Sequence, residues 1–392
     1  MLDPHTISTI KSTIPALLAT GSSLTAYFYD RMFTHNPELK NIFNMSNQHN
    51  GKQREALFNT LCACATHIEN LSVLQPVIEK IAQKHASLAI QPNDYEIVGK
   101  HLLATLEEKL SPGTTVLTAW GEAYRILASL FITREEEIYR ESEGKPGGWR
   151  GLRSFYISKI DTQSEKIKSF ILTPTDGLPV ADYCAGQYLS VWLRTASGQQ
   201  IRQYSLTQSP NGKDYRIAVR HADNGKVSGW LHQQAKTGDE LLLTPPAGDF
   251  FLDVQTDTAI ALISAGAGQT PMLSMLDVLV RQQHPKTIWW FHATDNGRQH
   301  AFDKEVTEKG AGLATFSQCI WYNSPLPQDN DHYHREGLME LMPYRHEISD
   351  PDMQFYLCGP TGFMQSVTQQ LMATGISRQR IHYETFGPHQ VI

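Results

Sequence analysis

The first third of the chain carries apolar residues at helical spacing. Side chains such as Leu24, Phe28 and Met32, or Phe131 and Ile138, recur at intervals of three, four or seven residues. That interval places them on one face of an α-helix. Prolines punctuate the pattern at positions 4, 15, 37, 76, 92 and 112. The pattern predicts an all-α domain over residues 1–142.

The pattern changes after the glycine- and proline-containing segment 143–149, which we interpret as a linker. Beyond it, short stretches rich in β-branched and aromatic residues are separated by Asp-Gly, Ser-Gly and Asn-Gly pairs. These stretches are 155–157, 167–172, 187–193, 201–206 and 215–219. Short strands with such turn signals are typical of a small antiparallel β-barrel, predicted here over residues 150–254.

The last third alternates buried-type strands with helices. Near-continuous apolar runs occupy 259–264, 287–291, 316–321 and 354–357, and helical stretches occupy 272–281 and 362–374. This arrangement predicts an α/β domain with a parallel sheet over residues 255–392. The charge-free segment 258–276 is long enough to span a membrane, but two glycines and a proline break it. A strand, a turn and a helix start explain it better.

Composition narrows the class of protein. The 392 residues include 34 Lys+Arg and 40 Asp+Glu, so the formal charge is −6. A mildly acidic chain has no general attraction to nucleic acid, and no nucleic-acid partner is expected. Five cysteines do not indicate a disulfide framework. With no signal-peptide pattern at the N-terminus, we expect a cytoplasmic protein without a membrane span.

Two motifs stand at strand ends of the predicted α/β domain. The first follows the strand 259–264 and consists of Gly266, Ala267, Gly268, Gln269, Thr270 and Pro271. Glycines let backbone N–H groups approach a phosphate at a helix N-terminus. A tight turn is the alternative, because proline replaces the third glycine of the dinucleotide fingerprint. The second motif is Cys358, Gly359 and Pro360, which could also simply begin a helix.

The predicted barrel and the chain end carry aromatic and charged residues in a pattern of their own. One strand contains Arg202, Gln203, Tyr204 and Ser205, and the strand before it contains Tyr188. A cation beside an aromatic ring suits a ligand with a phosphate and a flat ring, although a solvent-facing Arg and a core Tyr would look the same. The chain end carries Glu384, Thr385, Phe386, Gly387 and Pro388.

These motifs, in this order, resemble those of the ferredoxin-reductase-like flavoproteins over residues 150–392. The resemblance implies FAD contacts for Tyr188 and the Arg202–Ser205 strand, and a nicotinamide-dinucleotide site at the Gly266–Pro271 and Cys358–Pro360 turns. It places Phe386 near the flavin with Glu384 beside it. Thr385 departs from the small apolar residue or cysteine expected there. Asp295 would favour NADH and Arg298 NADPH, and we favour NADH.

The helical domain contains residues in the order typical of a globin. The order is Tyr29, Phe43, Gln53, Leu57, His85 and Tyr95, and Gln53 and His85 lie 32 positions apart. Spacing alone does not separate His85 from His67 or His101. Glu135 shares the apolar face of Phe131 and Ile138, where a carboxylate needs a partner. The alternative is a solvated run of three glutamates.

The whole chain therefore resembles the flavohaemoglobins. The resemblance implies haem b with one iron, FAD and NADH or NADPH as cofactors, and His85 as the iron ligand. Tyr95 and Glu135 would hold that histidine, and Tyr29 would hydrogen-bond dioxygen. Phe43, Gln53 and Leu57 would line the haem pocket, and Lys84 would reach a haem propionate or simply face solvent. No Cys-x-x-Cys-His motif for covalent haem occurs.

The activity that this resemblance implies is nitric oxide dioxygenase, in which NAD(P)H supplies electrons through FAD to haem and nitric oxide becomes nitrate. The expected partners are O2, NO and NAD(P)H, with lipid in the distal pocket as a weaker expectation, and the expected state is a monomer. Two alternatives remain: an oxygen sensor, and a flavin reductase that serves an external acceptor.

Overall fold

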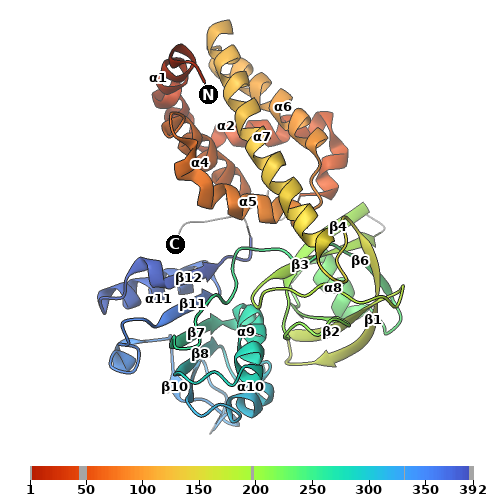
Figure 1. Ribbon diagram of the computed structural model, residues 1–392, viewed down its shortest axis with the longest axis vertical. Helices are drawn as coiled ribbons and strands as arrows, with labels where there is room; N and C mark the ends of the chain where they lie inside the picture. Colours follow the sequence, from red (N-terminus) through yellow and green to blue (C-terminus); the bar gives the residue numbers. More distant parts are fainter. Residues whose placement is uncertain (1, 44–50, 196–197, 331, 388–392) are drawn as a thin grey trace. The chain divides into compact units, whose positions relative to one another are not determined.

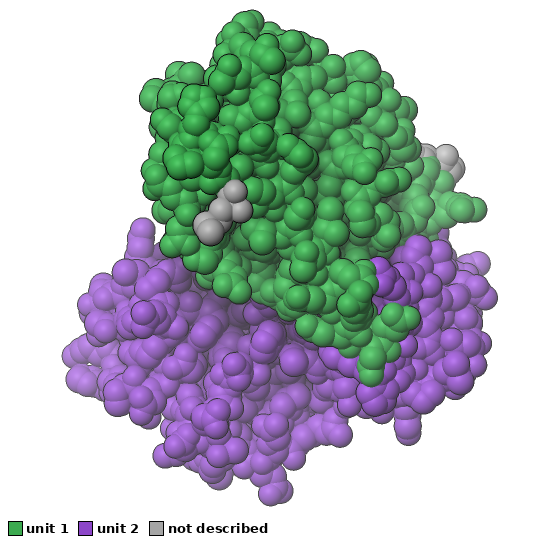
Figure 2. Space-filling view, turned by 45° about the horizontal axis from the view of Figure 1, so that its top comes forward, with its two compact units in different colours: residues 1–144, 192–202, 387–390 green, residues 145–191, 203–386, 391–392 purple. Residues whose placement is uncertain are grey.

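The computed structural model describes residues 2–43, 51–195, 198–330 and 332–387. The chain forms two compact units, which are coloured separately in Figure 2. The first comprises residues 1–144 with 192–202 and 387–390, and the second comprises 145–191, 203–386 and 391–392. Each unit is described by itself.

Residues 4–144 of the first unit are mostly helical (Figure 1). The helices are α1 (Pro4–Thr20), α2 (Ser22–His35), η1 (Pro37–Asn41), α4 (Lys52–Thr66), η2 (Leu71–Leu74), α5 (Gln75–Ser87), α6 (Pro92–Leu110) and α7 (Thr114–Gly144). Four prolines of this region lie in the first turns of α1, η1, α5 and α6, where the missing backbone N–H costs little. Pro15 was expected to interrupt a helix and instead lies inside α1, which continues because Ile10 and Leu17 on either side are buried.

The helical core consists of two apolar clusters. The larger joins α1, α2, α4, α6 and α7 and includes Tyr29, with Phe43 and Leu57 packed against it. The smaller lies between α5, α6 and α7 and includes Tyr95 and Phe131. The helical residues predicted to lie around one site are therefore divided between two clusters. This division matters because a flat prosthetic group has two faces to be covered.

A six-stranded sheet follows, formed by β1 (Arg153–Thr162), β2 (Ile167–Pro174), β3 (Tyr188–Thr195), β4 (Gly198–Ser205), β5 (Tyr215–Arg220) and β6 (Glu240–Leu243). The strand order is β4-β3-β6-β1-β2-β5, and β1 and β2 pair antiparallel with their neighbours β6 and β5. A bridge between Leu206 and Ile217 connects the two edge strands, so the sheet closes. Neither β6 nor the helix α8 (Lys226–Gln233) was predicted.

The second sheet is parallel, in the order β10-β9-β8-β7-β11-β12. Its strands are β7 (Ile260–Ala265), β8 (Ile288–Thr294), β9 (Phe316–Tyr322), β10 (Arg335–Glu336), β11 (Gln354–Cys358) and β12 (Ile381–Glu384). Its helices are η3 (Gly266–Gly268), α9 (Gln269–Arg281), α10 (Asp303–Gly310), η4 (Met342–Tyr344), α11 (Thr361–Ala373) and η5 (Arg378–Arg380).

Helices cover both faces of the parallel sheet. Alternate β7 residues face two different cores: Leu262 packs with α9 and α10, and Ile263 packs with α11. The predicted fold class, all-α followed by an antiparallel barrel and an α/β domain, is confirmed. The domain boundaries given above remain predictions. Across the described ranges, no helix is both long and apolar enough to cross a membrane.

Candidate functional site

His85 lies in the last turn of α5, and its ring is held by two polar side chains. Its Nδ1 lies 2.9 Å from Glu135 Oε1 and 2.8 Å from the Tyr95 hydroxyl oxygen. The Tyr95 hydroxyl also donates to Glu135 Oε1. The rings of Tyr95 and Phe131 lie beside the imidazole, with centroids 6.0 and 5.9 Å away. The three predicted residues His85, Tyr95 and Glu135 thus meet in one arrangement.

The hydrogen bonds determine which ring nitrogen of His85 carries the proton. Burial, together with the Glu135 carboxylate, raises the pKa of the Tyr95 phenol far above its usual value, so the phenol keeps its proton. A carboxylate oxygen only accepts hydrogen bonds, and the Tyr95 proton is already donated to it. Nδ1 therefore donates, and Nε2 carries the lone pair. Among the described residues, none hydrogen-bonds Nε2 of His85.

Glu135 differs from the two glutamates that follow it. It is 3% exposed, whereas Glu136 pairs with Arg140 and Glu137 with Arg134 at the surface. A solvated run therefore does not describe Glu135. Its burial follows from its place on the inner face of α7, in register with Phe131. A buried carboxylate is stable here because Tyr95 and His85 both donate to it.

Tyr124 supports this arrangement and was not singled out from the sequence. Its hydroxyl donates to the Tyr95 carbonyl oxygen at 2.6 Å. A Cβ at Gly99 would lie 2.4 Å from the Tyr124 ring, so the small residue allows α6 to pack closely on this ring. Position 124 has the same periodicity as 128, 131 and 135, which is the signal that could have identified it.

The other histidines considered from the sequence have different surroundings. Both ring nitrogens of His101 are engaged, Nδ1 with Arg31 at 2.6 Å and Nε2 with Asn36 Oδ1 at 2.9 Å. An arginine cannot accept, so His101 uses its lone pair for that contact. His67 is exposed at the end of α4. Of the three, His85 is the one whose ring is held through Nδ1 while no described residue hydrogen-bonds its Nε2.

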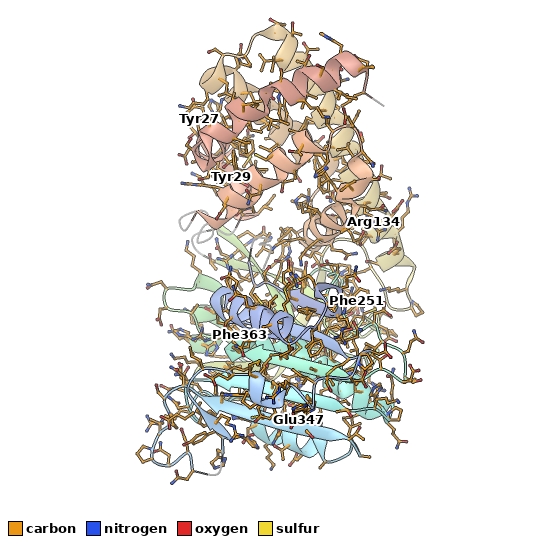
Figure 3. The ribbon with its side chains drawn as sticks, turned by 90° about the vertical axis from the view of Figure 1, so that its left-hand side faces the viewer. Tyr27, Tyr29, Arg134, Phe251, Glu347 and Phe363 are labelled. Atoms are coloured by element: carbon orange, nitrogen blue, oxygen red, sulfur yellow. The ribbon has the colours of Figure 1, made fainter. Side chains whose placement is uncertain are left out.

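The residues predicted for the other side of a haem gather around α2. Tyr29, labelled in Figure 3, is 5% exposed, and its ring contacts those of Phe33 and Phe43. Gln53 and Leu57 lie near the start of α4, which packs on α2. Lys84 immediately precedes His85 on α5. Of the predicted distal set, Tyr29, Phe43 and Leu57 thus lie in or against the larger helical cluster, whereas Tyr95 of the proximal set lies in the smaller one.

These residues fit a haem. An imidazole with a free Nε2 lone pair is the ligand that haem iron takes from a globin. His85 is 33% exposed on its side chain, which leaves one side of the ring accessible. Aromatic and aliphatic side chains on the two clusters suit the faces of a porphyrin.

The predicted flavin residues lie on neighbouring strands. Tyr188 begins β3, and Arg202, Gln203, Tyr204 and Ser205 end β4 beside it. A Cβ at Gly248 would lie 2.8 Å from the Tyr188 ring, and Gly248 has φ +119°, so glycine allows the ring to lie against this turn. A guanidinium and two phenol rings fit a ligand that combines a diphosphate with a flat ring system.

The two turns of the parallel sheet pack against each other. A Cβ at Gly268 would lie 2.1 Å from the Cys358 carbonyl oxygen, because β7 and β11 are adjacent strands. At the second turn, a Cβ at Gly359 would lie 2.8 Å from the Phe363 ring, labelled in Figure 3. Because glycine has no side chain, Gly268 and Gly359 present only backbone at the carboxyl edge of the sheet, which is where α/β proteins bind ligands.

Gln269 supplies direct support for a ligand at this edge. It is the first residue of α9 and is 1% exposed, and neither its amide nitrogen nor its amide oxygen has a hydrogen-bond partner among the described residues. An unpaired buried amide is costly, so a bound molecule that hydrogen-bonds it is the natural explanation. The turn and this amide together fit a dinucleotide at a helix N-terminus.

The segment that precedes the chain end forms a strand of the parallel sheet. Glu384 is 8% exposed and ends β12, where it pairs in register with Cys358. Thr385, Phe386 and Gly387 follow, and the Phe386 ring is 55% exposed. Pro388 lies outside the described residues. Asp295 and Arg298 are exposed beyond β8, and the choice between NADH and NADPH stays a prediction.

Three family models match successive parts of the chain. A globin model matches residues 26–130, an oxidoreductase FAD-binding domain model matches 154–252, and an oxidoreductase NAD-binding domain model matches 262–369. The matched order is the order of the helical region, the closed antiparallel sheet and the parallel sheet.

Solved structures resemble the chain over different lengths. A flavohaemoglobin from Malassezia yamatoensis, solved with bound FAD and haem, is 25% identical with a TM-score of 0.88, covering 98% of this chain and 100% of that one. The flavohaemoglobin-like FAD/NAD-binding domain of a nitric oxide dioxygenase from Vibrio cholerae is 38% identical (TM-score 0.55), covering 60% of this chain and 99% of that one. The cytochrome b5 reductase domain of Ulva prolifera nitrate reductase is 16% identical (TM-score 0.53), covering 60% and 97%, and shares the fold.

Proposed function

The chain belongs to the flavohaemoglobin family, and from this premise we propose that it is an NAD(P)H-dependent nitric oxide dioxygenase with haem b and FAD as cofactors. The domains make it an oxidoreductase. Its substrates in this proposal are nitric oxide, dioxygen and NAD(P)H, and its product is nitrate. Three observations support the proposal: the family, the arrangement around His85, and the Gly266–Pro271 and Cys358–Pro360 turns of the parallel sheet.

The cofactors, when bound, supply an iron at which the two gases react and a flavin that converts the two-electron donor NAD(P)H into a one-electron source. Each nitric oxide that combines with dioxygen to give nitrate takes up one electron. One NAD(P)H, giving up two electrons and one proton, therefore supports two nitrates. The residues of this chain bind, orient and insulate these groups.

On one side of the haem, His85 would ligate the iron through Nε2. Glu135 and Tyr95 hold the opposite nitrogen at 2.9 and 2.8 Å, which fixes the ring orientation and keeps the proton on Nδ1. A carboxylate on that nitrogen makes the imidazole a stronger electron donor. Stronger donation favours activation of dioxygen over its reversible storage, as thiolate ligands do in oxygen-activating enzymes.

On the other side, the Tyr29 hydroxyl would donate a hydrogen bond to the reacting gas, and Phe43 and Leu57 would exclude water. These side chains belong to one apolar cluster, in which Tyr29 is nearly fully buried. A hydroxyl in a dry pocket stabilises developing negative charge more strongly than it would in water. Gln53 would add a second polar group at the start of α4.

In the reductase half, Arg202 and Tyr204 would orient the flavin, and the Gly266–Pro271 and Cys358–Pro360 turns would bind the nicotinamide dinucleotide. The unpaired Gln269 amide would hydrogen-bond that coenzyme. Phe386, exposed beyond β12, would cover the flavin ring.

One observation favours an enzyme over an oxygen sensor. It is the buried Glu135 carboxylate on the His85 imidazole, in a chain that also contains reductase domains. A sensor needs neither a strongly donating axial ligand nor an electron supply. A flavin reductase for an external acceptor would need no such arrangement around a histidine at all.

The test is nitric oxide consumption at an electrode, in aerated buffer with NADH, using full-length protein with haem and FAD bound. We expect rapid removal that requires both dioxygen and NADH, with nitrate as product and two nitrates per NADH. The His85→Ala variant is expected to lose haem and nitric oxide removal together. The His67→Ala variant, altered at an exposed histidine, should behave as the wild type.

Failure to remove nitric oxide, in protein whose spectrum shows intact haem and flavin, would rule the dioxygenase out. Slow autoxidation with negligible NADH turnover would then indicate the sensor. Unchanged NADH turnover with an added acceptor in the His85→Ala variant would indicate the external-acceptor reductase.

A further inference from the structure

Within the second unit, a run of alternating charges joins the antiparallel barrel to the helices of the parallel sheet. Arg216 of β5 donates through two nitrogens to the Glu305 carboxylate of α10, at 2.7 and 2.9 Å. The same guanidinium donates to the Thr207 hydroxyl at 2.8 Å and to the Thr207 carbonyl oxygen. Such paired, charge-assisted contacts fix both distance and angle.

The run continues to α9. Lys309, one turn after Glu305, places its ammonium 2.8 Å from Glu305 Oε1 and 2.8 Å from Asp277 Oδ1. The other Asp277 oxygen accepts the backbone N–H of Ser209 at 2.7 Å. We call the set Thr207, Ser209, Arg216, Asp277, Glu305 and Lys309 the barrel–helix network.

The charged members of the network are largely withdrawn from water. The exposed fractions of their side chains are 15% for Arg216, 22% for Glu305, 22% for Lys309 and 19% for Asp277. Two positive and two negative charges balance. Burying them costs desolvation energy that largely offsets their attraction, so stability alone is a weak reason for such a network. Its best-supported use is to specify one arrangement of the parts it joins.

The network reaches both candidate cofactor regions without entering either. Thr207 and Ser209 follow within four residues of Ser205, the end of the predicted flavin strand. Asp277 lies two turns into α9, whose first residue is Gln269. A second contact, from Arg281 of α9 to the Ser209 hydroxyl at 2.7 Å, strengthens the same link. A shift of α9 against the barrel would therefore have to break the network.

We propose that the barrel–helix network is a positioning device for electron entry: it holds α9 and the flavin strand at the separation at which the nicotinamide can reduce the flavin. The inference rests on the proposed FAD and NAD(P)H sites. In that reduction a hydride leaves the reduced nicotinamide with both electrons of its C–H bond and forms an N–H bond on the flavin. Such a transfer requires the reacting atoms to be about 3–3.5 Å apart, so small displacements slow it strongly.

The experiment measures flavin reduction by NADH in the full-length protein with haem and FAD, under anaerobic stopped flow. The Glu305→Gln variant keeps the side-chain size and removes the charge. We expect its limiting rate of flavin reduction to fall at least about fivefold, while the apparent dissociation constant for NADH changes less than about twofold. Asp277→Asn should act in the same direction, and Arg216→Lys, which keeps one charge, should be intermediate.

A second readout does not depend on turnover. Hydrogen exchange of the segments 207–216 and 303–310, measured without NADH, should be faster in Glu305→Gln than in the wild type. The matched control is Lys304→Gln, which removes an exposed ion pair from the same helix; Lys304 lies 3.7 Å from Glu308. The control should change neither the rate nor the exchange.

An unchanged limiting rate in both Glu305→Gln and Asp277→Asn would overturn the inference, and so would a rate that falls only through weaker NADH binding. Lower thermal stability with unchanged flavin reduction would identify a purely structural network. Failure of this inference can be distinguished from failure of the proposed function. If the wild type reduces its flavin with NADH but removes no nitric oxide, the dioxygenase proposal fails and the inference stands. A wild-type flavin that neither NADH nor NADPH reduces would overturn both.

Discussion

Glu135 shows how the surroundings of a residue decide what it can do. Glu135, Glu136 and Glu137 are identical in chemistry and adjacent in sequence, yet only the first is buried against His85. The 3.6-residue turn of α7 places the first inward and the next two toward arginines at the surface. At the same scale, Gln269 is a buried amide with no partner among the described residues.

The Glu135→Gln variant should lower the rate of nitric oxide removal about tenfold, because a neutral amide makes the His85 imidazole a weaker donor. The iron–histidine stretching frequency, read by resonance Raman spectroscopy, should fall with it. Glu136→Gln, one residue along the same helix, is the matched control and should alter neither. Equal rates for the two variants would contradict the proposed role of Glu135.

Replacing Gln269 by leucine should raise stability and impair coenzyme use. Removing two unpaired buried polar atoms is expected to increase the free energy of unfolding by about 1 kcal/mol. The KM for NADH should rise at least about tenfold if the amide binds the coenzyme. Urea unfolding and steady-state kinetics measure the two effects, and a destabilised variant with unchanged KM would count against a ligand at this position.

At the scale of elements, the parallel sheet creates its site by bringing turns together. The Gly266–Pro271 and Cys358–Pro360 turns are about 90 positions apart in sequence. They meet because β7 and β11 are neighbours, with Ser264 opposite Cys358 in the register. The close approach depends on glycine at 268, where a side chain would overlap the Cys358 carbonyl oxygen.

Gly268→Ala should therefore separate the two turns. A Cβ placed 2.1 Å from a backbone oxygen must displace one turn, and we expect destabilisation of about 1–3 kcal/mol together with weaker NADH binding. Thermal unfolding and coenzyme titration are the measurements. Gly362→Ala is the matched control, since its added Cβ meets no atom within 4 Å. The same loss in both variants would show that close packing is not the cause.

At the scale of the whole molecule, charged side chains link the antiparallel barrel to the helices of the parallel sheet within the second unit. Burial by itself would raise the pKa of the Glu305 carboxyl, but hydrogen bonds and attraction from Arg216 and Lys309 lower it below its usual value of 4.5. Asp277 behaves in the same way, with Lys309 and Ser209 overcoming the effect of burial. Both carboxyls therefore stay ionised in the folded protein at more acidic pH than in the unfolded chain.

This difference makes the stability of the second unit depend on pH. A carboxyl whose pKa is lowered on folding stabilises the protein above its unfolded pKa, and the stabilisation is lost as pH falls through the folded pKa. We expect Glu305→Gln to reduce the free energy of unfolding by about 2 kcal/mol near neutrality. The difference from wild type should shrink below roughly pH 4. Urea titrations at several pH values test this, and a pH-independent difference would contradict it.

The sequence by itself determined the local elements and their order. Periodicity indicated the long helices and most strands because it records which face of each element meets a core. The glycine turns and the inward position of Glu135 could also be predicted, because each depends on the residues of one element: glycines directly after a strand, and helical spacing with Phe131. The class of fold followed from the sequence of patterns, and the structure confirms it.

Only the tertiary structure decided which elements are partners. The short strands β6 and β12 exist because neighbours pair with them, and four residues carry too little periodic signal to show this beforehand. The bridge from Leu206 to Ile217 closes the barrel and joins residues 11 positions apart, and the pairing of Arg216 with Glu305 joins residues 89 positions apart. Contacts of this kind depend on how the chain packs, so they leave no repeating pattern in the sequence.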